Sequence, residues 1–242
     1  MNQYRSLVKI KKITEARFLE IDKYLNFIKQ LEEQQNAIKG KVNVDIDVIN
    51  IQKNTVFIML YNIIEYSIYA GIYHIYCILG NKNFNKLRNE IKEKIISDFI
   101  DAPKWTNPPK LNEDIEKIER DIILLWAQIK KDNHASLVKK AKWNIDYKNI
   151  NIILGCYWVD RLDTINKNEC DLFDSIKYRR NALSHWSQGF SENTTTSVDD
   201  LLDLMCIVKN VVFDFFNKVW SFVKCKKYMK EAASTADETR PM

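Results

Sequence analysis

Glycine and proline are scarce in this sequence, with five and four residues among 242. Because these two residues interrupt regular structure, their scarcity argues against the many tight turns of an all-β protein. We find no internal repeat and no alternating apolar pattern of useful length. The composition instead favours residues that form helices well, such as isoleucine, leucine, lysine and glutamate. We therefore expect an all-α fold.

Cysteine and histidine are also scarce, with five and three residues. The number of cysteines is odd and no pair has CxxC spacing, so we expect reduced cysteines rather than disulfides or zinc ligands. The HxxxH, HExxH and clustered-aspartate patterns of metal sites are missing as well. We therefore expect neither a metal nor a cofactor.

Charge of one sign does not dominate, because 37 lysines and arginines face 32 acidic residues, for a formal charge of +5. This small excess permits an anionic partner such as RNA, but a solvated helical surface with slightly more lysine is the simpler explanation. Residues 1–12 have no apolar run before their charges. We therefore expect no signal peptide and a cytoplasmic protein.

Apolar residues recur at three- and four-residue steps along most of the chain, as they do in amphipathic helices. Asp146 and Ser197 are predicted to cap two of these helices, and Gly155 is predicted to end one. The predicted helices cover about 14–38, 45–79, 84–100, 112–130, 146–155, 163–185 and 198–222.

Three of the four prolines lie in the segment 102–109, which predicts an extended loop. The helices on either side of this loop are amphipathic and suited to pack on each other. We therefore predict a single domain over residues 1–228 and a flexible tail over residues 229–242.

The predicted helix 45–79 is the most apolar in the chain and is long enough to span a membrane. Asn62, Glu65, Ser67 and His74 interrupt it, and a charge deep in lipid costs roughly 2.5–3.5 kcal/mol. We therefore expect the central helix of a bundle and no membrane partner. Glu65 would then be partly buried and would need a donor. That donor is either a structural partner on a neighbouring helix or part of an active site.

The stretch 178–186 gathers more groups able to do chemistry than any other. His185 can exchange a proton near neutral pH, and Arg180 can bind a phosphate through two hydrogen bonds. Together they suit RNA cleavage, in which histidine accepts the proton of the 2′-hydroxyl and arginine stabilises the charge on the phosphoryl oxygens. The candidate substrate-binding residues beside them are Lys177, Arg179 and Ser184.

Helical geometry limits this site. Asn181 and His185 are four residues apart and share a face, so Asn181 could orient the imidazole, while Arg180 projects at a neighbouring angle. One arginine and one histidine make a sparse site, whereas a second copy across a two-fold axis would supply two of each. The same residues also fit cations near a helix C-terminus, where the helix dipole favours them. The stretch alone does not separate these two interpretations.

The sequence Arg180-Asn181-Ala182-Leu183-Ser184-His185 resembles the signature of HEPN proteins, in which four to six residues separate an arginine from a histidine. A polar residue often follows the arginine. Residues 60–65 (Leu-Tyr-Asn-Ile-Ile-Glu) are similar to an early-helix motif of the MAE-type bacterial subgroup. Residues 144–155 and 189–192 resemble the segments before and after its signature helix. The resemblance covers about residues 16–223.

This resemblance implies an antiparallel helical bundle with additional short helices, and a homodimer with facing Arg/His pairs. It also implies metal-independent endoribonuclease activity in a toxin–antitoxin, abortive-infection or other anti-phage system, with an antitoxin or another defence protein as a partner. Arg180 and His185 match the catalytic pair, and Asn181 matches the polar position. Glu65 matches a motif position and is a candidate auxiliary residue without an assigned role.

The sequence departs from the family at Trp186, where many relatives have a small residue. A subgroup modified by AMP transfer has tyrosine at the position of Ser187, so we do not expect that regulation here. Two alternatives to a ribonuclease stay open. One is a non-catalytic HEPN module that binds a nucleotide or a protein partner, and the other is a structural helical scaffold.

Overall fold

The computed structural model describes residues 6–37, 45–79, 82, 84–100, 145–185, 187–192 and 195–230. Within these ranges the fold is all-α and contains no strand, as the sequence predicts. The elements are α1 (Leu7–Ala37), α2 (Ile46–Leu79), η1 (Phe84–Lys86), α3 (Asn89–Ile100), α6 (Tyr147–Cys156), α7 (Lys167–Ser184) and α8 (Val198–Lys224). The predicted loop 102–109, the predicted helix 112–130, Trp186 and the tail from residue 231 lie outside the described residues.

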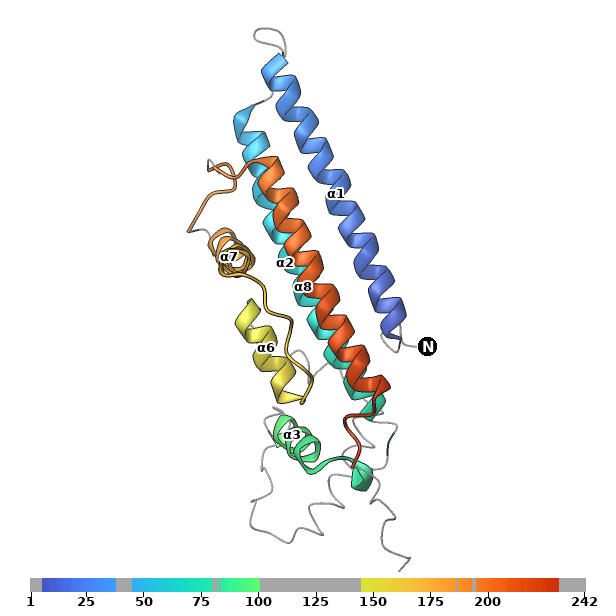
Figure 1. The fold of residues 1–242 in the computed structure, drawn as a ribbon. Coiled ribbons are helices and arrows are strands. Elements are labelled where there is room, and N and C mark those ends of the chain that lie inside the picture. The colour runs from blue at the N-terminus through green and yellow to red at the C-terminus, as the bar shows by residue number, and fades with distance from the viewer. Residues whose placement is uncertain are drawn as a thin grey trace, which may run out of the picture.

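The three longest helices, α1, α2 and α8, pack against one another and form the core (Figure 1). α1 runs antiparallel to α2 and α8, which both begin at the end of the bundle where α1 finishes. The predicted apolar stripe of α8 is confirmed, because its inward side chains are buried along the whole helix. Burial of each large apolar side chain contributes about 1.5–3 kcal/mol to the free energy of unfolding.

α2 is the central helix, in contact with α1, α7 and α8. Its length and composition would allow it to cross a membrane, yet 61% of its most apolar window is buried inside the protein. The burial agrees with the prediction that this segment is the central helix of a bundle. Gly71 lies close against α8, because a Cβ atom there would lie 2.7 Å from Cζ of Phe215.

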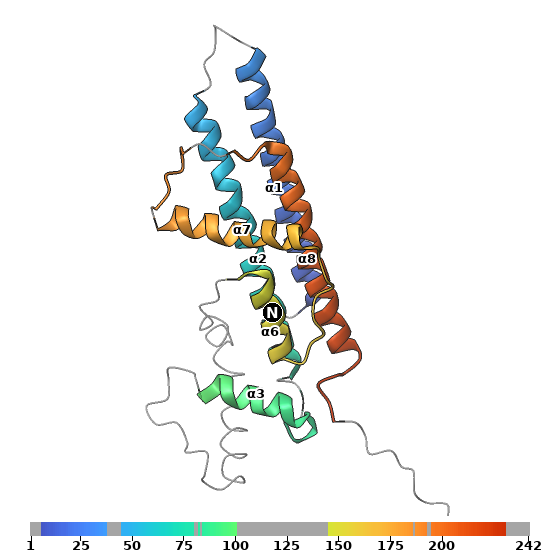
Figure 2. The same cartoon turned by 60° about the vertical axis from the view of Figure 1, so that its left-hand side comes forward.

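α7 runs across α2 rather than along it, and α6 lies beside α7 (Figure 2). α7 begins in a capping box, in which the Asn166 side chain accepts from Glu169 N and the Glu169 carboxylate accepts from Asn166 N. The predicted start at Asp163 is therefore wrong, because Asp163 lies before the cap and forms an ion pair with Lys218. Leu172, predicted to face inward, is 48% exposed.

The predicted N-caps are confirmed, since Asp146 accepts from Asn149 N at 2.7 Å and Ser197 Oγ accepts from Asp200 N at 3.0 Å. Three other boundaries differ from the prediction. α1 begins at Leu7 rather than near residue 14, α3 begins at Asn89 rather than near residue 84, and Gly155 lies inside α6.

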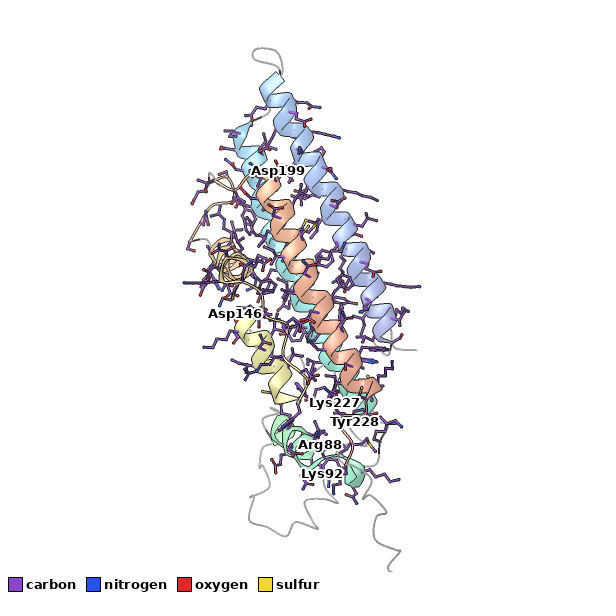
Figure 3. The ribbon with its side chains drawn as sticks, in the orientation of Figure 1. Arg88, Lys92, Asp146, Asp199, Lys227 and Tyr228 are labelled. Atoms are coloured by element: carbon purple, nitrogen blue, oxygen red, sulfur yellow. The ribbon has the colours of Figure 1, made fainter. Side chains whose placement is uncertain are left out.

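The segment after α8 returns to the start of α3. Leu87 and Met229 form an isolated antiparallel bridge, and Arg88 N donates to Tyr228 O at 3.0 Å. Arg88, Lys92, Lys227 and Tyr228 therefore gather at one end of the bundle (Figure 3). Met229 and Lys230, the first residues of the predicted tail, are held in this pairing because Lys230 N donates to Lys86 O.

Candidate active site at the end of α7

His185 is the C-cap of α7, and its backbone N donates to Asn181 O at 3.0 Å. The chain then reverses, because Gln188 N and Ser187 Oγ both donate to the carbonyl of Ala182. This turn leaves His185 exposed at the end of the helix, next to the exposed Ser184. The predicted base is thus accessible to a substrate.

Arg180 lies against α2. Its guanidinium carbon is 4.3 Å from the centroid of the Tyr61 ring, and its Nη1 donates to Asn181 Oδ1 at 2.9 Å. Tyr61 is buried, so the ring is a fixed surface for the cation. The structure therefore pairs the Asn181 side chain with Arg180, and a bond from it to the His185 imidazole stays a prediction.

Glu65 joins this group through the spacing of α2, in which Tyr61, Glu65 and Tyr69 follow at intervals of four residues and so share a face. Burial raises the pKa of Tyr69, the charge of Glu65 raises it further, and Arg180 lowers it. Glu65 and Arg180 therefore each lie within electrostatic range of the Tyr69 phenol. Glu65 is half-buried, as predicted. Tyr69 was not among the predicted site residues, although its spacing of four residues from Glu65 could have identified it.

Within one chain, Arg180 and His185 do not face the same way. Five residues turn a helix by about 500°, which leaves the two side chains about 140° apart. Arg180 is directed at α2, whereas His185 is exposed. Tyr178, seven residues before His185 and therefore on the same side of α7, is 66% exposed.

Arg179 contacts a different part of α2. Its Nε donates to Asn54 Oδ1 at 3.1 Å, and its guanidinium lies 5.7 Å from the ring centroid of Phe57. Asn54 is fully buried and donates to the carbonyls of Phe190 and Glu192 at 2.7 and 3.3 Å. Burial lowers the pKa of Arg179, and the charge of Glu192 opposes this effect. Arg179 therefore joins α7 to α2 and to the loop that follows α7.

A cleft of about 390 Å³ lies beside Arg179. The Nη2 atom of Arg179 is buried and has no hydrogen-bond partner among the residues that the structure describes. The lining combines this cation with aromatic and neutral polar side chains. The residues that line the cleft are Phe57, Ser175, Tyr178, Arg179, Ala182, Gln188 and Thr196.

Lys177 was predicted to bind substrate, but its ammonium group faces α6. Its Nζ lies 2.6 Å from Oδ2 of Asp146, and the two side chains are only 13% and 14% exposed. The hydrogen bond to Asp146 raises the pKa of Lys177. Asp146 also caps α6, so this ion pair joins the beginning of α6 to the middle of α7. The geometry therefore gives Lys177 a structural partner.

The structure thus brings Arg180 and Asn181 together against Tyr61, places Glu65 one turn further along α2, and leaves His185 and Ser184 exposed. Among the described residues, no three His, Cys, Asp or Glu side chains are grouped to hold a metal ion. Comparisons with protein family models, curated proteins and solved structures return no match for this chain. Its functional interpretation rests on its own residues and geometry.

Proposed function

We propose that this protein is a metal-independent endoribonuclease of the HEPN type, which acts in a toxin–antitoxin or anti-phage system through Arg180 and His185. The observation that carries the proposal is that both groups lie at the end of α7, one exposed and the other held against α2. His185 is an exposed C-cap, and Arg180 is held between Tyr61 and Asn181.

In the proposed reaction, the neutral His185 imidazole accepts the proton of an RNA 2′-hydroxyl, and the 2′-oxygen attacks the adjacent phosphorus. The bond from phosphorus to the 5′-oxygen breaks, and that oxygen takes a proton from a protonated histidine. The products are a 2′,3′-cyclic phosphate and a 5′-hydroxyl. Arg180 stabilises the charge that develops on the phosphoryl oxygens. It gives one donor to Asn181, and a guanidinium has five.

The reaction needs an acid as well as a base, which supports a site shared by two chains. Arg180 and His185 of one chain lie on different sides of α7, about 140° apart. A homodimer that sets the ends of two α7 helices against each other would supply two histidines and two arginines to one groove. This arrangement explains why a single chain presents only half of the required groups.

The test is RNA cleavage in EDTA by the wild type, His185→Ala and Arg180→Ala, with analysis of the product ends. We expect 2′,3′-cyclic phosphate ends. The loss in rate should be about 10²–10⁴-fold for His185→Ala, which removes an acid–base group, and about 10²–10³-fold for Arg180→Ala, which removes a group that stabilises developing charge. Asn210→Ala, on the exposed side of α8, is the control and should cleave normally. If both site variants are folded and cleave at the wild-type rate, the assignment is wrong.

A second candidate function is nucleotide binding without catalysis, and the cleft beside Arg179 favours it. The buried Nη2 of Arg179 is suited to a phosphate oxygen, and the exposed ring of Tyr178 is suited to a base. In this case RNA would stay intact with every variant. ATP binding measured by calorimetry would weaken in Gln188→Ala, which removes a polar side chain from the cleft wall.

A further inference from the structure

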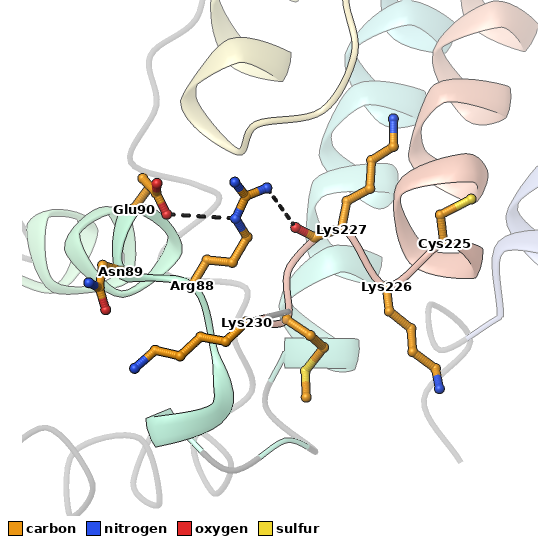
Figure 4. A pocket seen from close by; sticks show the side chains of 8 residues that line it. Arg88, Asn89, Glu90, Cys225, Lys226, Lys227 and Lys230 are labelled. Carbon is orange, nitrogen blue, oxygen red and sulfur yellow. Dashed lines mark hydrogen bonds and ion pairs between the residues drawn. The ribbon is translucent and has the colours of Figure 1, made fainter. Parts of the chain in front are cut away.

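Basic side chains gather in a second cleft, at the end of the bundle where α3 begins (Figure 4). The cleft has a volume of about 540 Å³. Its two walls are the first residues of α3 and the segment that follows α8. The residues that line it are Arg88, Asn89, Glu90, Cys225, Lys226, Lys227, Met229 and Lys230. Four of them are cationic and one is acidic.

The positive charge of this cleft is only partly neutralised. Arg88 Nε lies 3.8 Å from the carboxylate of Glu90, a long ion pair, and Lys227 Nζ lies 2.6 Å from Asp160 Oδ2. Lys226 and Lys230 are exposed and have no ion-pair partner among the residues that the structure describes. The cleft therefore presents uncompensated cations to any ligand that enters it.

Lys226 occupies an unusual backbone conformation, with φ of 52°. The turn that ends α8 requires it, because Lys227 N donates to Phe222 O and Lys226 N donates to Val223 O. Glycine is the usual residue at this position of such a turn, since it adopts positive φ without steric cost. A lysine here keeps a strained conformation and places a charge in the cleft. Strain of this kind is common at functional sites.

We propose that this cleft binds phosphate groups of an RNA backbone. The identity of the polyanion rests on the proposed ribonuclease function, whereas the cation cluster is independent of it. Lysine and arginine side chains bind successive phosphates without reading sequence. The N-terminus of α3 adds positive potential at the same place. α6 lies between α7 and α3 (Figure 1), so this cleft at the start of α3 is separate from the proposed active site at the end of α7.

The test compares two charge-reversed pairs in the full chain carrying His185→Ala, so that RNA is bound but not cut. Binding of a fluorescein-labelled, unstructured 20-nucleotide RNA is followed by anisotropy at several salt concentrations. Lys226→Glu with Lys230→Glu should weaken binding at least tenfold. The logarithm of the association constant decreases linearly with the logarithm of the salt concentration, and this slope should become less steep by about 1.4, or about 0.7 for each lost phosphate contact.

The control pair, Lys23→Glu with Lys209→Glu, makes the same charge change at exposed positions of α1 and α8. Equal weakening by both pairs would show a long-range charge effect and overturn the inference, as would unchanged binding in the cleft pair. A third variant, Lys226→Gly, relieves the strained turn. It should raise the midpoint of thermal unfolding and lower RNA affinity. Unchanged affinity in this variant also contradicts the proposal.

Cleavage by the chain with His185 intact is measured in parallel and separates the two proposals. If that chain cuts RNA but the cleft pair binds RNA as the control does, the cleft inference fails and the ribonuclease stands. If RNA stays intact but the cleft pair binds it more weakly than the control, the ribonuclease fails and the cleft stands.

Discussion

Arg179 and Arg180 are neighbours in the sequence, but their surroundings in the structure differ. Arg179 donates to the buried Asn54, whereas Arg180 lies over the ring of Tyr61. Successive residues on a helix point about 100° apart, so only one of two adjacent arginines can take each position. We infer that Arg179 has a structural role, and the proposed ribonuclease function assigns Arg180 to the substrate.

Asn54 is the residue on which this structural role depends. Its side chain accepts from Arg179 and donates to two carbonyls of the loop after α7. Asn54→Ala would leave these buried groups unpaired and should lower the free energy of unfolding by about 2–3 kcal/mol. Asn62→Ala, at an exposed position of the same helix, should change it by less than about 0.5 kcal/mol. Urea unfolding measures both, and equal effects would contradict the prediction.

The sequence predicted the burial of Glu65 better than it predicted the contacts of Lys177 and Asn181. The partial burial of Glu65 followed from its place in an apolar helix, and the structure confirms it. The partner of Lys177 did not follow, because Asp146 is 31 residues away. The contact of Asn181 with Arg180 depends on how α7 is rotated about its own axis. Packing of α7 against α2 fixes this rotation, and the sequence of α7 alone does not specify that packing.

Whether a helix boundary could be predicted from the sequence depends on whether neighbouring residues or tertiary contacts determine it. Asp146 and Ser197 act as predicted because a cap depends on the next three residues. The start of α7 was predicted at Asp163, and Asn166, three residues later, is an equally suitable cap residue. The choice falls on Asn166 because Asp163 pairs with Lys218 of α8. That contact joins residues 55 positions apart and has no local signal.

Close packing of α2 on α8 should be sensitive to one added methyl group. A Cβ atom at Gly71 would overlap the ring of Phe215, which is fully buried. Gly71→Ala should therefore destabilise the protein by about 1–3 kcal/mol, as overpacked cores do. Gly155→Ala is the matched control in α6, where nothing lies within 4 Å of the added atom.

At Gly155 the same substitution should stabilise the helix by about 0.5–1 kcal/mol, because glycine is a poor helix former. Thermal unfolding of the two variants measures the difference. A stabilising effect of Gly71→Ala would mean that the helices are farther apart than the structure places them.

The stability of the protein should depend on pH through Asp174, which lies at the junction of α6 and α7. Its Oδ1 accepts from Tyr147 N at 2.9 Å, and burial raises its pKa above the ordinary 3.8. The folded state therefore binds the proton more tightly than the unfolded state. The contribution of Asp174 to stability is largest below pH 3.8 and falls as pH rises through the raised pKa.

Asp174→Asn keeps the acceptor oxygen and removes the charge. We expect a higher midpoint of thermal unfolding than the wild type at pH 7, and a smaller difference as pH approaches 4. Asp171→Asn, an exposed neighbour on α7, should show little change at either pH. A gain in Asp174→Asn that is constant with pH would exclude the titration of Asp174 as its cause.

The long helices bury their apolar faces in one core, while the outer side of α7 stays uncovered in a single chain. Tyr178 is 66% exposed there and lies on the same side as His185. Under the proposed ribonuclease function, this exposed aromatic ring is available for contact with a second copy of the chain. A dimer that brings the ends of two α7 helices together would cover Tyr178 and complete the active site.

Tyr178→Asp should therefore convert a dimer into a monomer and abolish RNA cleavage without loss of helical structure, because charges are unfavourable in the core of an interface. Trp220→Asp is the control, since Trp220 is 51% exposed on α8 and lines a different surface together with Leu7 and Val8. It should leave both dimer and cleavage intact. Sedimentation velocity and cleavage rates over a range of protein concentrations measure the effect. A wild type that is monomeric and whose rate per chain is independent of concentration would contradict the shared site, because a half site in each chain can act only after two chains meet.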